Sequence, residues 1–173
     1  MKEIEVKILD VNPASVRRRL KSLGAKKIFG PVLVRELFFE HPDVPAKKRG
    51  YTSFRLRLVG REVEITVKTA RAGGRYKVQD EREIVVNDFA AARALIEALG
   101  FRVFRTREKK REEYRLGAAK VEIDEYPGLA PYLEVEAKTK REVAAAVAKL
   151  GFTMAHASTA TATELLVAAG LNG

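Results

Sequence analysis

The sequence predicts an α+β protein built around an antiparallel β-sheet. Most of its segments alternate aliphatic with charged residues, which is the pattern of a strand with one face on a core. The links between neighbouring segments are short, and short links favour antiparallel pairing. Helical patterns interrupt the strands and dominate the last third of the chain. The length of 173 residues fits a single domain, which we place at residues 1–173.

Helix start and stop signals separate the elements. Asn12 caps a helix that Pro13 opens and Gly24 ends, and Asp88 caps a second helix that Gly100 ends. The predicted strands lie within residues 2–11, 25–42, 54–59, 62–69, 75–86, 101–116, 118–127 and 131–138. The predicted helices lie within residues 12–24, 89–100, 140–151 and 161–170. We find no internal repeat.

The clearest hairpin surrounds Gly60 and Arg61. These two residues join the strictly alternating segments 54–59 and 62–69, and a short link that contains glycine is typical of an antiparallel hairpin. A basic loop at residues 46–53 precedes this hairpin, and its composition predicts exposure to solvent.

Composition limits the chemistry. The chain has no cysteine, which excludes disulfides, thiolate nucleophiles and Cys-ligated metals. No apolar run reaches the length of a membrane span and no signal peptide opens the chain, so we expect a cytoplasmic protein with no membrane partner. Lys and Arg number 33 against 23 Asp and Glu, a formal net charge of +10, which indicates a polyanionic partner.

The charged residues of nearly every strand share one parity, and residues two apart in a strand point to the same face. The opening segment shows the pattern, because Glu3, Glu5 and Lys7 alternate with Ile4 and Val6. The further charged residues on this parity are Arg55, Arg57, Glu64, Lys68, Arg75, Lys77, Glu81, Glu83, Arg107, Lys109, Arg111, Glu122, Asp124, Glu134, Glu136 and Lys138, and the polar Thr66 and Gln79 share it. Seven of the eight predicted strands carry ionised groups on one face, which exceeds what a solvated sheet requires.

A closed barrel of about eight strands would turn this charged face into an interior. Burying both signs of charge is costly unless the charges pair or bind ions. A polyphosphate bound with a divalent cation satisfies both sets, since Lys and Arg neutralise phosphate oxygens while carboxylates hold the metal. Carboxylate ligands favour Mg²⁺ or Mn²⁺. On this interpretation Glu3 and Glu5 are metal ligands and Lys7 contacts phosphate.

Seven short motifs resemble the CYTH or triphosphate tunnel metalloenzyme superfamily, which includes class IV adenylyl cyclases, thiamine triphosphatases and inorganic triphosphatases. They follow the family's order over nearly the whole chain. The motifs are "EIEVK", "FRLRL", "TVK", "EREI", "KKREEY", "EIDEYPGL" and "YLEVE". The resemblance implies a closed eight-stranded antiparallel β-barrel, with flanking helices, that binds a triphosphate and a divalent metal.

The resemblance also implies roles for single residues. The implied metal ligands are Glu3, Glu5, Glu134 and Glu136, with Glu122 as a candidate for a second metal. The implied substrate-binding residues are Lys7, Arg55, Arg57, Lys68, Lys109 and Arg111, and we add Lys77 from the same charged face. The candidate catalytic residues, which would orient the attacking water, are Glu81, Glu83 and Asp124.

These features leave three functions open. The first is a metal-dependent triphosphatase that removes the terminal phosphate of tripolyphosphate, ATP or another nucleoside triphosphate. The second is an adenylyl cyclase that makes cyclic AMP and pyrophosphate from ATP through the same phosphate clamp. The third is a binding module for polyphosphate or nucleotide without turnover, since the basic residues supply affinity in either case.

Three further expectations concern partners and stability. Nucleic acid ranks below triphosphates as a partner because no aromatic stacking platform lies beside the basic loop. A monomer and a homodimer both stay open. We also expect cations in an empty site to repel one another, so that Lys7→Met or Arg57→Met weakens substrate binding while thermal stability holds or rises.

Overall fold

The computed structural model describes residues 2–44, 48, 50–71 and 74–171. Part of the predicted basic loop, residues 46, 47 and 49, lies outside these ranges. The described strands are β1 (Lys2–Ile8), β2 (Lys26–Glu40), β3 (Ser53–Val59), β4 (Glu62–Arg71), β5 (Lys77–Val86), β6 (Arg102–Leu116), β7 (Ala119–Glu125), β8 (Tyr132–Ala137) and β9 (Ala157–Ser158). The described helices are α1 (Pro13–Ser22), α2 (Phe89–Ala98), α3 (Lys140–Lys149) and α4 (Ala162–Ala168).

The strand pairings confirm the predicted fold class. The strands follow the order β5-β4-β3-β2-β6-β7-β8-β1-β9, and β5 also pairs with β1. These pairings close eight strands into an antiparallel β-barrel. Along the sequence, the four described helices lie between strands or after the last one. The strand β9 was not predicted, because its two residues are too few to show an alternation.

The chain folds into two compact units. Unit 1 contains residues 32–71 and 79–108 together with the N-terminal end of β1, and it includes α2 and the β3–β4 hairpin. Unit 2 contains residues 3–31, 72–78 and 109–173, and it includes α1, α3, α4, β7 and β8. The assignment of residues 1–173 to a single domain stays a prediction.

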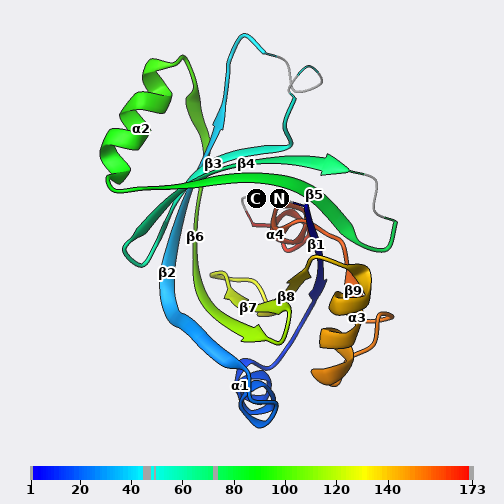
Figure 1. Cartoon of the computed structure of the whole chain (residues 1–173). Helices are drawn as coiled ribbons and strands as arrows, with labels where there is room; N and C mark the ends of the chain where they lie inside the picture. The colour runs from blue at the N-terminus through cyan, green and yellow to red at the C-terminus, as the bar shows by residue number, and fades with distance from the viewer. Residues whose placement is uncertain (1, 45–47, 49, 72–73, 172–173) are drawn as a thin grey trace. The chain divides into compact units, whose positions relative to one another are not determined.

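The core of unit 1 lies between its strands and α2. The β3–β4 hairpin pairs Leu56 with Ile65 across the ladder, as the alternation predicts. Leu56 packs with Phe39 of β2 and with Ala92 and Ile96 of α2 in one buried cluster. Figure 1 shows α2 beside these strands. The helix starts where the sequence predicts, because the Asp88 side chain accepts a hydrogen bond from the Ala91 backbone N–H at 2.9 Å.

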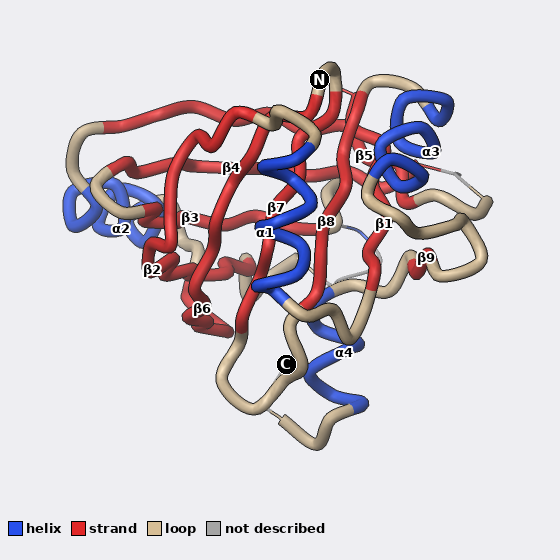
Figure 2. Tube along the Cα trace, turned by 90° about the horizontal axis from the view of Figure 1, so that it is seen from below, coloured by secondary structure: helices blue, strands red, loops and turns tan. Residues whose placement is uncertain are grey.

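The core of unit 2 lies under β7, β8 and β1. The register aligns Val121 of β7 with Val135 of β8, and Val135 with Val6 of β1, so their aliphatic side chains share one face. Leu20 of α1 and Val143 of α3 pack on this face, and none of the five is measurably exposed. Figure 2 shows α1 crossing β7 and β8. Each such burial stabilises the fold by roughly 1.5–3 kcal/mol.

The ends of these strands carry a smaller cluster, in which Tyr126 and Tyr132 stack at a centroid distance of 6.2 Å beside Leu166 of α4. Among the described residues, no helix is long and apolar enough to cross a membrane.

Candidate functional site

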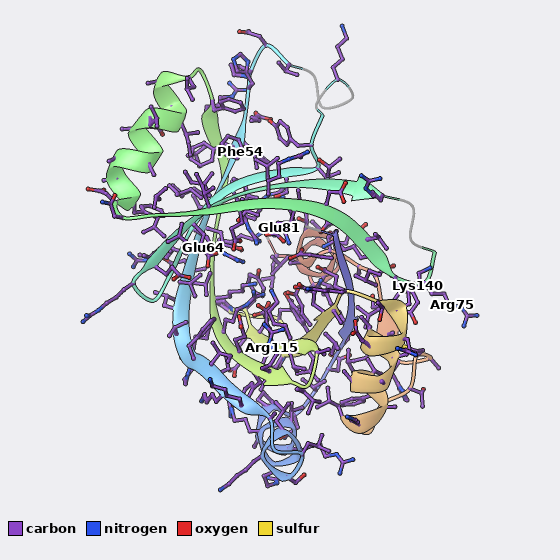
Figure 3. The ribbon with its side chains drawn as sticks, in the orientation of Figure 1. Phe54, Glu64, Arg75, Glu81, Arg115 and Lys140 are labelled. Atoms are coloured by element: carbon purple, nitrogen blue, oxygen red, sulfur yellow. The ribbon has the colours of Figure 1, made fainter. Side chains whose placement is uncertain are left out.

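In each unit the charged side chains occupy the strand face opposite the apolar core. Figure 3 shows this arrangement in unit 1, where Phe54 points to the α2 side of the strands while Glu64 and Glu81 point to the other side. The alternation of β3, β4 and β5 produces it, because residues two apart share a face. The predicted charged face is therefore present within each unit.

The charged face of unit 1 is organised around Arg57. Its Nε contacts the Glu64 carboxylate on the neighbouring strand β4, and its Nη2 lies 3.2 Å from Glu83 Oε2 on β5. The Thr66 hydroxyl donates to the same Glu83 oxygen at 3.1 Å. Arg57, Glu64 and Thr66 are buried, so this group is largely shielded from water.

Two further ion pairs extend this face. Lys68 Nζ lies 2.8 Å from Glu81 Oε2, and Arg55 Nη1 lies 3.0 Å from Glu36 Oε1. The Arg55 Nε is buried and makes no hydrogen bond among the described residues. Of the predicted residues, unit 1 thus brings together Arg55, Arg57, Lys68, Glu81 and Glu83.

The Glu83 carboxyl differs from a surface carboxyl in its proton affinity. Burial raises the pKa of Glu83, and the neighbouring carboxylates Glu64 and Glu81 raise it further, although Arg57 acts in the opposite direction. A carboxylate with a raised pKa accepts a proton more readily near neutral pH. Glu83 therefore takes up a proton more readily than a surface carboxylate does.

The charged face of unit 2 is centred on Arg111 of β6. Its guanidinium binds Asp124 through two contacts, Nε to Oδ1 at 2.7 Å and Nη2 to Oδ2 at 2.6 Å. The same guanidinium reaches Glu122 Oε1 at 2.7 Å and Glu134 Oε2 at 2.9 Å. Lys109 adds a second cation to Asp124, with 2.7 Å between Nζ and Oδ2. One arginine therefore neutralises parts of three carboxylates on β7 and β8.

Asp124 and Glu122 both contact the Arg111 guanidinium, yet their pKa values shift in opposite directions. Burial alone would raise the pKa of Asp124, but Arg111 and Lys109 outweigh it and hold that pKa below its usual value. Burial raises the pKa of Glu122 to about 7, and the nearby carboxylates Glu134 and Asp124 act in the same direction. Asp124 is therefore a persistent anion, whereas Glu122 exchanges a proton near neutral pH.

Lys7 of β1 bridges two carboxylates. Its ammonium lies 3.1 Å from Glu5 Oε1 and 2.8 Å from Glu134 Oε1, and the Lys77 ammonium lies 2.8 Å from the same Glu5 oxygen. Burial disfavours the charge on Lys7, yet Glu134 and Glu5 outweigh burial and raise its pKa. In return, Lys7 and Arg111 hold the pKa of Glu134 well below its usual value despite burial.

The structure also adds residues that the sequence did not single out. Glu36 is buried as the partner of Arg55, and it lies in a segment with no predicted site residue. Lys120 of β7 lies 2.8 Å from Glu136 Oε2 and 3.6 Å from Glu122 Oε1. Parity could have revealed Lys120, because it shares the face of Glu122 and Asp124.

The carboxylates of unit 2 suit a hard divalent cation in their chemistry. Glu5 and Glu134 each place an oxygen within 3.1 Å of the single Lys7 ammonium, so the two acids converge on one cation. Within the described ranges, however, no three acidic or imidazole side chains form a ready metal cage, because Lys and Arg stand between them. Glu3, at the start of β1, is partly buried. Metal binding at this face therefore requires an exchange of ion-pair partners.

Comparison with known proteins agrees with the motifs. A family model described as the CYTH domain matches residues 1–162. The chain resembles the PH1012 protein of Pyrococcus horikoshii OT3 with a TM-score of 0.76 and 26% identity, covering 94% of this chain and 98% of that one. No curated protein sequence matches.

Two other solved structures share the fold. A candidate adenylate cyclase from Vibrio parahaemolyticus has a TM-score of 0.83 at 17% identity, covering 95% of this chain and 97% of that one. The Hippeastrum protein HpAC1, a candidate adenylyl cyclase described as having a dominant triphosphatase activity, has a TM-score of 0.63 at 16% identity, covering 98% and 96%. Since the family model spans nearly the whole chain, this protein belongs to the CYTH domain family.

Proposed function

We propose that this protein is a divalent-metal-dependent triphosphatase that hydrolyses the terminal phosphoanhydride of tripolyphosphate or of a nucleoside triphosphate. The observation that carries the proposal is the pairing of buried cations with largely buried carboxylates on the charged face of unit 2. Lys7 and Arg111 each hold carboxylates through oxygens that a phosphate chain could replace. Guanidinium and ammonium groups bind phosphate oxygens with the same charge-assisted hydrogen bonds.

In unit 2, phosphate oxygens would take Lys7, Lys77, Lys109 and Arg111 as partners. The carboxylates released in this way, with Glu5 and Glu134 foremost, are the proposed metal ligands together with the predicted Glu3. A bound divalent ion would neutralise charge on the phosphate chain and polarise its oxygens. The chemistry then needs little beyond positioning and charge neutralisation, as is usual for phosphoryl transfer.

The attacking water needs a carboxylate that accepts a proton. Among the candidates, Glu83 fits this role because its pKa is raised by burial and by two nearby acids. Asp124 suits the role of base less well, since before phosphate binds Lys109 and Arg111 contact both of its oxygens and hold its pKa below its usual value. The arginines Arg55 and Arg57 and the amine of Lys68 are the proposed phosphate contacts of unit 1.

Adenylyl cyclase chemistry is the second candidate, favoured by the description of the Vibrio relative. Both reactions use cationic phosphate contacts and differ in the phosphorus atom that is attacked. Product analysis separates them: purified protein is incubated with tripolyphosphate, ATP and GTP, each with Mg²⁺ and with Mn²⁺. Orthophosphate as the main product supports the triphosphatase, and cyclic AMP with pyrophosphate supports the cyclase. If the protein binds all three compounds but forms no product, both enzymatic proposals are wrong and the protein is a binding module.

A substitution tests the proposed role of the carboxylates. We predict that Glu5→Gln lowers kcat at saturating metal by about 100-fold or more, because the change keeps the side-chain volume but removes a ligand charge. Circular dichroism should show the fold retained, since Lys7 keeps Glu134 as a partner. Glu97→Gln is the matched control, because Glu97 is exposed on α2 and pairs only with Arg93 among its described ion pairs. Near-normal kcat of Glu5→Gln would contradict the proposed metal role.

A further inference from the structure

Lys120 holds a position that no predicted role explains. It lies on β7 of unit 2, and the β7–β8 register places it directly opposite Glu136. Its ammonium lies 2.8 Å from Glu136 Oε2 and 3.6 Å from Glu122 Oε1. Both of these carboxylates are candidate metal ligands from the sequence. Lys120 therefore places a single positive charge beside two predicted metal ligands.

Three other cations of this face lie in sequence motifs that resemble those of the CYTH family, whereas Lys120 lies outside these motifs. Lys7, Lys109 and Arg111 all belong to segments for which the family resemblance implies phosphate contacts, whereas Lys120 belongs to none. Phosphate binding offers Lys7 and Arg111 new partners, and their acids then become available. Lys120 has no such implied exchange partner. Phosphate binding elsewhere on the face would therefore offer Lys120 no partner in place of Glu122 and Glu136.

The surroundings of Lys120 favour a persistent contact. The Glu122 side chain is 4% exposed and the Glu136 side chain is 20% exposed, so water neutralises neither charge fully. Arg111 already divides its guanidinium among three carboxylates, one of them Glu122. A second cation beside Glu122 and Glu136 balances charge that Arg111 leaves uncompensated. A divalent ion placed there would lie within a few ångströms of an ammonium and be repelled.

We infer that Lys120 is a built-in cation that excludes divalent metal from Glu122 and Glu136. Metal on the charged face of unit 2 is then confined to the group around Glu5 and Glu134. The inference rests on the proposed function for the use of that metal. It departs from the sequence-based prediction in one respect: Glu136 and Glu122 act as partners of Lys120 instead of as ligands.

Equilibrium dialysis of the metal-free, full-length protein against Mn²⁺, without phosphate, tests this inference. Lys120→Met removes the charge at nearly constant length, and the variant should bind one Mn²⁺ per chain more than the parent. Lys120→Arg keeps a cation and should bind as many as the parent. The matched control is Arg115→Met, because Arg115, labelled in Figure 3, is an exposed cation directly opposite Lys120 in the β6–β7 ladder. Arg115→Met should not change the Mn²⁺ count.

Two outcomes overturn the inference: equal Mn²⁺ counts for Lys120→Met and the parent, or an equal gain in Arg115→Met. If Lys120→Met is unfolded without metal, recovery of its fold with Mn²⁺ supports the inference. Failure to recover overturns it, provided that the double variant Lys120→Met/Glu136→Gln folds. That double variant should also lose the extra Mn²⁺. Turnover of the parent is measured separately, so a failed inference leaves the triphosphatase proposal standing, and absent turnover overturns the proposed function alone.

Discussion

Replacing Lys7 by methionine distinguishes repulsion between cations from pairing with acids. The sequence led us to expect repulsion, so that Lys7→Met would preserve or raise thermal stability. In the structure, Lys7 is 1% exposed and its ammonium pairs with Glu5 and Glu134. The pKa of Lys7 is raised, which means that folding stabilises its charged form. We therefore predict that Lys7→Met destabilises the protein.

The magnitude follows from what each acid retains. Removing one partner of a buried ion pair costs about 3–5 kcal/mol when the other charge is left alone. Glu5 keeps Lys77 at 2.8 Å and Glu134 keeps Arg111 at 2.9 Å, so neither acid is left alone. We expect the low end, about 3 kcal/mol. For a chain of this length, that loss lowers Tm by roughly 6–12 °C.

The assay is thermal and urea unfolding at pH 7.5 in a chelating buffer, followed by circular dichroism. The double variant Lys7→Met/Glu134→Gln should recover part of the loss, because it also removes an acid. Lys7 holds the pKa of Glu134 below its usual value, and stability from a lowered pKa is lost as pH falls through the folded value. The gap between parent and Lys7→Met should therefore narrow at acidic pH. An unchanged or higher Tm for Lys7→Met would refute the pairing argument.

Two further predictions concern unit 2. Burial raises the pKa of Glu122 to about 7, whereas in the unfolded chain the pKa of a glutamate is about 4.3. Between these two pH values the folded protein therefore holds a proton that the unfolded chain has released. The free energy of unfolding falls as pH rises through this range. Glu122→Gln, in chelator, should therefore gain stability relative to the parent from pH 5 to 8, and a constant difference across that range would contradict the assignment. Gly30→Ala should lower Tm far more than Gly24→Ala. Both glycines have positive φ, so an alanine strains the backbone at both positions. A Cβ at Gly30 would lie 2.5 Å from the Arg111 carbonyl oxygen, whereas a Cβ at Gly24 would meet nothing within 4 Å. Similar Tm values for the two variants would argue against that close approach.

The faces of the strands were predictable because alternation has a period of two, which a short segment displays without help from the rest of the chain. Glu64 and Phe54 therefore lie on the faces expected of them. The caps were predictable for a similar reason, since Asn12 and Asp88 accept hydrogen bonds from residues only three positions ahead.

The partners of the charged residues were not predictable in this way. Whether Lys7 meets another cation or an acid depends on the β1–β8 register, which places it opposite Glu134 across more than a hundred residues of sequence. Parity places Lys120 on the charged face, but its pairing with Glu136 depends on the β7–β8 register. Single segments reveal which face a charge occupies, whereas ion pairing is a property of aligned strands.

The balance of charge in unit 2 bears on what the proposed substrate must bring with it. Among the described residues, the ion pairs of this face join Lys7, Lys77, Lys109, Arg111 and Lys120 to Glu5, Glu122, Asp124, Glu134 and Glu136. These ion pairs join five cations to five acids, so the paired groups together are neutral when all are ionised. A triphosphate chain that entered alone would leave several negative charges uncompensated in a poorly solvated place, which is costly. A divalent cation that arrives with the phosphate chain offsets two of these charges, and a proton on Glu122 offsets another. The same pairing that stabilises the empty face therefore favours metal-bound triphosphate over the bare anion.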